Sequence, residues 1–209
     1  MVPALDRCDT RGVEMDATVP AHVPVAERAP ERDFAPALRD VEAAPKSVGR
    51  LEAIVVRPSV ETRRTVDEAR VDVELGVVGD CWLERGSSST PDRSARLDSQ
   101  VTVISTRVLA AIEPDRGRWP LAGDQLYVDL DLSQANLPPG TRLEIGDVVL
   151  EVTPEPHIGC SKFSARFGSD ALRWTNSSRG RELRMRGMNT QCVRGGSVRV
   201  GDGVRVAGR

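Results

Sequence analysis

Short apolar runs, each interrupted by glycine or proline, restrict the fold of this chain more than any other feature. The 209 residues include 18 glycines and 14 prolines, which supply turns between extended segments. The clearest run covers residues 126–132, where apolar residues alternate with Tyr127, Asp129 and Asp131. This alternation is typical of a strand with one face in solvent. Many short strands with evenly spaced turns predict a mainly β protein, built as a barrel with a few short flanking helices.

The N-terminal region differs from the rest of the chain. Residues 1–30 contain four prolines and no sustained apolar periodicity, which predicts a disordered tail. Residues 31–43 are a short helix candidate, because Phe34, Leu38 and Val41 share one helical face. We therefore expect an N-terminal extension over residues 1–45 and one barrel domain over residues 46–209. Both Met1 and Met15 are candidate translation starts.

Composition argues against several classes of function. The net charge is −2 and aromatic residues make up 3% of the chain, so nucleic acid is not an expected partner. Four cysteines without a CxxC pair match neither a disulfide framework nor a zinc site. The first residues lack a signal-peptide pattern, and every apolar run is too short to span a membrane. We expect a cytoplasmic protein with reduced thiols and no membrane partner.

The segment around Cys160 carries the strongest chemical signal. Cys160, Phe163 and Phe167 are spaced i, i+3 and i+7, which predicts a short helix that Gly168 ends. Cys160 then lies near a helix N-terminus, and Lys162 and other cations are close in sequence. Both features favour the thiolate form of a cysteine, which a nucleophile or a metal ligand requires. The alternative is a small buried hydrophobic residue beside two phenylalanines, and the residues alone leave both open.

Other polar residues near these motifs are candidates with two interpretations each. His157 is either a base that deprotonates Cys160 or an ordinary polar residue. Asp80 is either a catalytic group or a turn residue that accepts backbone N–H bonds. Cys81 is either a second soft ligand or a structural turn residue. Basic residues near Cys160 suit bidentate phosphate contacts or a solvated charged face; the candidates are Lys162, Arg166 and Arg181.

Five glycine-containing motifs, in their order along the chain, resemble the MOSC domain. This is the C-terminal domain of molybdenum-cofactor sulfurases, and it also occurs as stand-alone bacterial proteins. The motifs lie at residues 76–80 (Gly-Val-Val-Gly-Asp), 123–126 (Gly-Asp-Gln-Leu), 140–146 (Gly-Thr-Arg-Leu-Glu-Ile-Gly), 159–160 (Gly-Cys) and 195–202 (Gly-Gly-Ser-Val-Arg-Val-Gly-Asp). Residues 121–126 and 136–140 are similar to a small stand-alone bacterial branch of the family.

The resemblance implies a β-barrel with flanking helices and a cleft for the molybdenum cofactor, molybdopterin, which carries a dithiolene and a phosphate. The family's cysteine falls on Cys160, which would carry sulfur or ligate molybdenum. His157 and Asp80 are further catalytic candidates. The cofactor-binding candidates are Lys162, Arg166, Arg181, Asp124, Gln125 and Asn136. The chain departs from the common pattern at Cys81-Trp82, where many members have a histidine, and at Asp124-Gln125, where many have Glu-Asn.

These features lead to one leading hypothesis for the function and two alternatives. The first is a cofactor-binding protein that moves sulfur to the cofactor, or handles it, through Cys160. The second is a molybdenum-cofactor-dependent reductase of N-oxygenated compounds, and the third is a non-catalytic cofactor carrier. A chain of 209 residues has no room for the pyridoxal-phosphate domain of a full sulfurase. Sulfur would then come from a separate cysteine desulfurase, and a reductase would need a redox partner.

Overall fold

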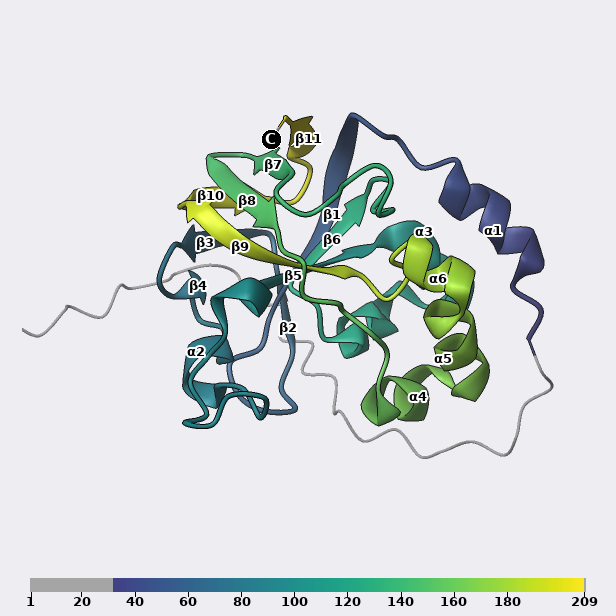
Figure 1. Cartoon of the computed structure of the whole chain (residues 1–209), viewed down its shortest axis with the longest axis horizontal. Coiled ribbons are helices and arrows are strands. Elements are labelled where there is room, and N and C mark those ends of the chain that lie inside the picture. Colours follow the sequence, from purple (N-terminus) through teal and green to yellow (C-terminus); the bar gives the residue numbers. More distant parts are fainter. Residues whose placement is uncertain (1–31, 209) are drawn as a thin grey trace, which may run out of the picture.

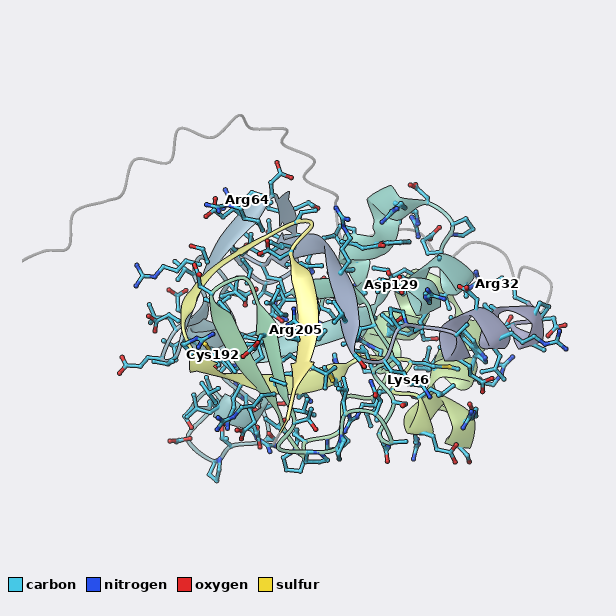
Figure 2. The ribbon with its side chains drawn as sticks, turned by 90° about the horizontal axis from the view of Figure 1, so that it is seen from above. Arg32, Lys46, Arg64, Asp129, Cys192 and Arg205 are labelled. Carbon is cyan, nitrogen blue, oxygen red and sulfur yellow. The ribbon has the colours of Figure 1, made fainter. Side chains whose placement is uncertain are left out.

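The computed structural model describes residues 32–208, and seven strands of this part of the chain close into a barrel (Figure 1). The strand order is β11-β7-β8-β9-β5-β6-β1, and β1 pairs with β11 to close the circle. Figure 2 shows β11, in yellow, beside β1. The barrel strands are β1 (Val48–Val56), β5 (Val101–Ser105), β6 (Leu126–Asp129), β7 (Arg142–Ile145), β8 (Val148–Val152), β9 (Met188–Arg194) and β11 (Gly203–Ala207). The predicted β-barrel is therefore confirmed.

Most neighbouring strands of the barrel are antiparallel, as the tight glycine turns require. β7 and β8 form a hairpin across Gly146 and Asp147, a pair of residues that favours tight turns. β5 and β6 are parallel, and a parallel pair needs a crossover connection. Helix α3 (Thr106–Ile112) and the 3-10 helix η2 (Arg116–Ala122) supply that crossover outside the barrel.

A β-bulge in β1 determines which of its side chains face the barrel interior. The register against β6 shifts between Leu51 and Ala53, so Leu51 and Ile54, three residues apart, are both fully buried in the barrel core. Ala53 and Val55 face the helical layer instead. A bulge places one extra residue opposite the partner strand and bends the chain.

Two small elements extend the barrel. β2 (Arg64–Val66) pairs with the end of β1. β10 (Gly196–Arg199), β3 (Glu68–Asp72) and β4 (Gly76–Val77) form a separate three-stranded sheet. Helix α2 (Trp82–Arg85) follows β4, and a long loop then leads through the 3-10 helix η1 (Leu97–Ser99) to β5.

A layer of helices covers the outer face of β1, β5 and β6, on one side of the barrel (Figure 1). It consists of α3 together with α1 (Ala35–Glu42), α4 (Ser161–Phe167), α5 (Ser169–Asn176) and α6 (Ser178–Glu182). The rings of Phe34 and Trp174 stack 4.7 Å apart and join α1 to α5. Among the described residues, no helix has the length and apolar character needed to cross a membrane.

The helical layer corrects one prediction. Residues 126–132 are expected to carry one solvent-exposed face, but Tyr127 on that face is fully buried. Its ring packs in the cluster between barrel and helices, and its hydroxyl donates to the Trp119 carbonyl at 3.1 Å. Alternation alone does not show that helices cover the second face of a sheet.

The N-terminal predictions have mixed outcomes. The helix expected over residues 31–43 is α1, which packs against α3. Ser105 occupies the N-cap position of α3, but its side chain makes no capping hydrogen bond. The disordered tail predicted over residues 1–30 lies outside the described residues.

Candidate functional site

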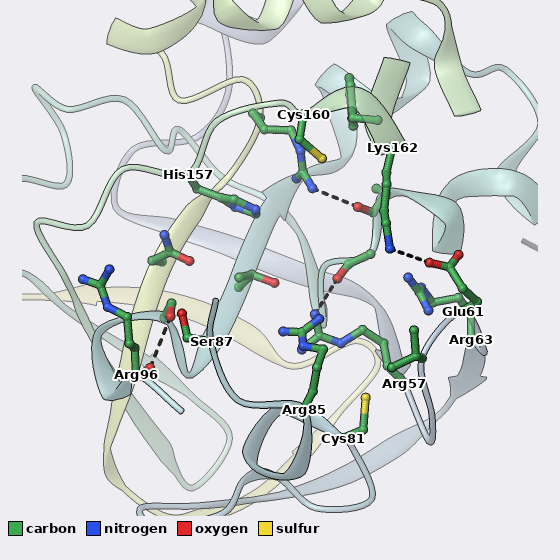
Figure 3. A pocket seen from close by; sticks show the side chains of 18 of the residues that line it. Arg57, Glu61, Arg63, Cys81, Arg85, Ser87, Arg96, His157, Cys160 and Lys162 are labelled. Atoms are coloured by element: carbon green, nitrogen blue, oxygen red, sulfur yellow. Dashed lines mark hydrogen bonds and ion pairs between the residues drawn. The ribbon is translucent and has the colours of Figure 1, made fainter. Parts of the chain in front are cut away.

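A pocket of about 360 Å³ lies at one end of the barrel, where β1 and β8 end and β5, β6 and β9 begin (Figure 3). Its walls come from five regions of the described chain. These are the connection from β1 to β2, helix α2 with the loop that leads into β5, the turn before β6, the segment from residue 155 into α4, and the segment that leads into β9. The barrel brings these connections to the same end, so the site depends on the fold.

The pocket is strongly positive although the whole chain has a net charge of −2. Within residues 32–208, its lining includes seven basic side chains and two carboxylates. The basic residues are Arg57, Arg63, Arg85, Arg96, Lys162, Arg166 and Arg186, and the acids are Glu61 and Glu155. A concave surface lined by one sign of charge concentrates ligands of the opposite sign. The pocket is therefore suited to an anion.

Asp80 positions one of these arginines. Its side chain is fully buried and bonds the Arg57 guanidinium through both oxygens, at 2.7 and 2.8 Å. It also accepts the backbone N–H groups of Arg57 and Trp82. Asp80 thus has its acceptors occupied behind the pocket wall, and the structure places it as a support for Arg57. This differs from the catalytic role predicted for Asp80 and agrees with the alternative of a backbone-binding turn residue.

Asp124 has a similar supporting position. Its buried carboxylate pairs with Arg186 at 2.7 Å, and Arg186 also donates to the Ala122 carbonyl at 2.9 Å. The Arg186 guanidinium lies 4.9 Å from the centre of the Phe163 ring. Arg186 lines the pocket and Asp124 lies behind it. Asp124 therefore orients Arg186, and Arg186 is the residue of this pair that lines the pocket.

His157 lines the pocket but is a poor base. Burial lowers the pKa of His157 to about 3, and the nearby Arg186 charge adds to this effect. Its Nδ1 atom is 3.4 Å from Asp124 Oδ1, which does not compensate for the loss of solvent. A neutral imidazole with so low a pKa has little tendency to take a proton near neutral pH. The geometry does not support the prediction that His157 deprotonates Cys160.

Three other predicted cofactor ligands lie away from the pocket of the described chain. Gln125 is buried and accepts hydrogen bonds from the Thr102 backbone and hydroxyl. Asn136 closes a turn by donating to the carbonyls of Lys46 and Asp131. Arg181, on α6, donates to the carbonyl of Asn176 at the end of α5. All three have structural hydrogen bonds, so their assignment from motif proximity is not supported.

Arg63 and Arg85 are the pocket cations whose charge is least compensated. Neither forms an ion pair with any residue of the described chain. Arg63 is only 8% exposed, and its Nε atom has no hydrogen-bond partner among residues 32–208. Burial and the neighbouring Arg166 and Arg57 charges lower the pKa of Arg63, and burial and Arg57 lower the pKa of Arg85. The buried Arg63 and the exposed Arg85 both lack a carboxylate partner among residues 32–208, and such uncompensated cations in one pocket favour an anionic ligand.

Gly123 lies in the turn before β6, close to two of these arginines. Its φ of +84° favours glycine, and an added Cβ would make ordinary van der Waals contacts, 3.6 Å from Arg63 Nη2 and 3.9 Å from Arg166 Nη1. Its carbonyl accepts a hydrogen bond from Arg57 at 2.9 Å. Motif reasoning selects the Gly-Asp pair at this position, but the part that touches the pocket is the glycine.

Cys160 is exposed and lines the pocket. It is the N-cap residue of α4, and Phe163 and Phe167 are buried on the face that the sequence predicts. Asn176 holds the preceding Gly159 with two hydrogen bonds, of 2.9 and 3.0 Å. A Cβ on Gly159 would lie 2.6 Å from the end of the Leu172 side chain, which would have to move. The alternative of a buried structural cysteine is thus wrong for Cys160.

Cys81 lines the same pocket from helix α2, on the side opposite Cys160 (Figure 3). It is 7% exposed, and its backbone N–H donates to the Arg57 carbonyl at 2.7 Å. The part of the chain that the structure describes holds no group of three His, Cys, Asp or Glu side chains able to bind a metal ion. A metal beside Cys160 would therefore have to bring donors from its own ligand.

Sequence reasoning misses Arg57, Arg63, Arg85 and Arg186 as site residues. Arg57 ends a predicted strand and Arg85 begins a long Ser-rich loop, of a length that often indicates function. These signals identify separate segments of the chain. Only the folded barrel shows that the segments come together at one pocket.

The structure is a closed β-barrel with a positive pocket and an exposed thiol at one end. These features define a class of small β-barrel protein that can hold an anion beside a cysteine. The family model of the MOSC domain matches residues 90–205, more than half of the chain. The chain belongs to the MOSC domain family, which confirms the resemblance seen in the sequence. This family is associated with the molybdenum cofactor.

Solved structures show the same fold. The YuaD protein from Bacillus subtilis is 16% identical, with a TM-score of 0.59 over 78% of this chain and 97% of that one. YiiM from Escherichia coli is 18% identical, with a TM-score of 0.51 over 77% of this chain and 70% of that one. A search of curated proteins finds no match.

The buried His157 predicts a pH dependence of stability. Its pKa is about 3 in the folded protein against an ordinary 6.5, so the unfolded chain binds the additional proton. Its contribution is fully present above about pH 6.5 and is lost as the pH falls toward about 3. Between about pH 7 and about pH 5, this group should lower the free energy of unfolding by about 2 kcal/mol. Urea unfolding of His157→Gln should lack this component, and equal pH slopes for the two proteins would contradict the assignment.

The exposures of the cysteines predict their labelling order. Cys160 is exposed, whereas Cys81 and Cys192 are buried, and burial raises the pKa of the Cys192 thiol to about 11. In a Cys8→Ser background, iodoacetamide near neutral pH should label Cys160 first and Cys192 last, as read by peptide mass spectrometry. Labelling of Cys81 at the rate of Cys160 would show that the pocket opens more widely than the structure indicates.

Proposed function

We propose that this protein binds the molybdenum cofactor in the positive pocket and carries sulfur to it, or otherwise handles it, through Cys160. The observation that carries the proposal is the combination of two uncompensated guanidiniums, Arg63 and Arg85, and an exposed thiol, Cys160, in one pocket. The association of the MOSC family with this cofactor supports the choice of anion.

The pocket residues fit the chemistry of the cofactor's phosphate. A phosphate monoester carries up to two negative charges near neutral pH and offers several acceptor oxygens. Arg63 has an unpartnered donor atom, and arginine forks match phosphate geometry. Arg57 and Arg186 are held by buried aspartates, so their orientation costs little on binding. Together with Arg85, these three arginines form the wall that we assign to the phosphate.

The cysteine fits the other end of such a ligand. When bound, the cofactor would supply molybdenum held by its own dithiolene sulfurs, which is consistent with a pocket that offers one exposed thiol and no three-residue metal cluster among residues 32–208. Cys160 offers the sulfur atom that a soft ligand or a nucleophile requires. His157 lines the same pocket and stays neutral.

The exposure of Cys160 favours the sulfur-carrying role. An exposed thiolate can attack the terminal sulfur of a persulfide on a separate cysteine desulfurase. One S–S bond forms on Cys160, the donor's S–S bond breaks, and the donor cysteine leaves as its thiolate. This exchange needs no oxidant or reductant. A reductase of N-oxygenated compounds would use Cys160 as a metal ligand instead, and it would require a redox partner.

Elemental analysis of protein made in a cofactor-competent host tests the proposal. We expect pterin to co-purify with the wild-type protein, together with cyanide-labile sulfur on Cys160. Cys160→Ser should fold normally and retain pterin but lose the labile sulfur, because a hydroxyl cannot hold a persulfide. Stoichiometric molybdenum without labile sulfur would favour the reductase, and pterin without either would favour a carrier. Absence of pterin from the wild-type protein would contradict the proposed function.

Charge removal tests the assigned wall. Arg63→Ala and Arg85→Ala should each lower the affinity for the cofactor by about 1.5–3 kcal/mol, the range for a hydrogen bond to a charged group. Arg205→Ala is the matched control, since Arg205 is an exposed arginine on β11 (Figure 2). Equal pterin retention by all three variants would remove Arg63 and Arg85 from the site.

A further inference from the structure

Glu61 is an acid placed among the cations that line the pocket. It lies on the connection between β1 and β2, and its two carboxylate oxygens accept hydrogen bonds from Lys162 Nζ and Arg166 Nη2, each at 2.7 Å (Figure 3). Both partners belong to α4, on the opposite wall. The carboxylate therefore ties two walls of the pocket together. The other lining acid, Glu155, pairs with Arg96 elsewhere in the pocket.

The segment that carries Glu61 is a small exposed turn. Thr62 donates its backbone N–H to the Ser59 carbonyl at 3.2 Å, and the two hydroxyls lie 2.8 Å apart. Glu61 has a φ of +67°, which a non-glycine residue adopts only at a cost. The adjacent Val60 is 62% exposed, so apolar packing does little to hold the tip of the turn. The ion pairs with α4 are thus a main restraint on its position.

Glu61 also occupies the groups that an incoming anion needs. Lys162 and Arg166 are next to the exposed Cys160 in sequence and line the same pocket. The hydrogen bond from Lys162 and the charge of Arg166 lower the pKa of Glu61, so the carboxylate is ionised near neutral pH. An ionised carboxylate in this position competes with any external anion for the same donors.

We propose that Glu61 is an internal competitor that closes the pocket mouth until a phosphate-class dianion replaces it on Lys162 and Arg166. The inference rests on the proposed function only in taking the ligand to be anionic. A dianion carries more charge than one carboxylate and can reach the uncompensated Arg63 at the same time. Displacement of Glu61 frees the Ser59–Thr62 turn to move outward. The residue thereby selects dianions over singly charged ions and couples ligand entry to opening of the mouth.

Calorimetric titration with inorganic phosphate tests the inference on the full chain. Glu61→Gln keeps the size of the side chain but removes the competing charge, and it should bind phosphate about three- to tenfold more tightly than the wild type, the range for one or two exposed ion pairs. Glu68→Gln is the matched control. Glu68 is 48% exposed and pairs with Arg199 at 2.9 Å, whereas Glu61 is 43% exposed. The control should bind phosphate as the wild type does.

A second pair of measurements tests whether Glu61 competes with phosphate or only holds the Ser59–Thr62 turn in place. If Glu61 competes for Lys162 and Arg166, the Glu61→Gln change should no longer raise the phosphate affinity when it is made in a Lys162→Met, Arg166→Met background. Unchanged or weaker phosphate binding by Glu61→Gln, or a gain equal to that of Glu68→Gln, would overturn the inference. If Glu61→Gln fails to fold, Glu61→Asp replaces it, since its shorter reach should weaken the bridge and give a smaller gain in the same direction.

Glycerol 3-phosphate distinguishes the source of the dianion. A gain with both ligands supports an esterified phosphate such as a cofactor's, and a gain with inorganic phosphate alone supports the competitor role with the free ion as ligand. The proposed function is judged separately by pterin content. Protein without pterin whose Glu61→Gln variant still binds phosphate more tightly would remove the cofactor assignment and leave the competitor in place.

Discussion

Strand β1 is the element on which the rest of the molecule depends. It pairs with β11 through its first residues, with β6 through its middle and with β2 through its last residues. The pairing with β11 closes the barrel, and the bulge after Leu51 turns successive side chains into the barrel core and into the helical layer. Arg57 directly follows the last residue of the strand and lines the pocket. The same strand therefore closes the barrel and lies between the barrel core and the helical layer. It also positions Arg57, the cation that follows it, in the pocket.

The electrostatics of the site follow from which cations have buried partners. Asp80 and Asp124 lie behind the wall and hold Arg57 and Arg186 in fixed orientations. Arg63 and Arg85 lack such partners within the described chain, and Glu61 satisfies Lys162 and Arg166 from inside the pocket. The pocket thus contains cations held by buried acids, cations without a partner, and cations paired with Glu61. The held cations are fixed in place, and the excess positive charge of the others can be balanced by an anion.

Much of the fold could be predicted from local pattern, because each strand and turn leaves a short-range signal. The hairpin at Gly146-Asp147 and the Cys160-Phe163-Phe167 helix face are examples. The buried state of Tyr127 could not be predicted, since its burial depends on helices that pack from elsewhere in the chain. The part of the site near Cys160 could be predicted, because its residues lie close together in one short segment of the sequence. Gln125 and Asn136 belong to family-like motifs, but their side chains hydrogen-bond to nearby backbone and side-chain groups. Arg63 and Arg85 come together in the pocket only because the barrel folds, and a local sequence pattern does not show this.

The closure of the barrel has a consequence for how the protein acquires its structure. β1 begins at Val48, and its partner β11 ends at Ala207, so the contact that completes the barrel joins residues about 150 positions apart. Contacts of such long sequence separation slow folding, because the chain loses loop entropy before they form. On the ribosome, β1 must wait for nearly the whole chain to emerge before it meets β11. Until then, β1 has a free edge, and the pocket at its end cannot be complete.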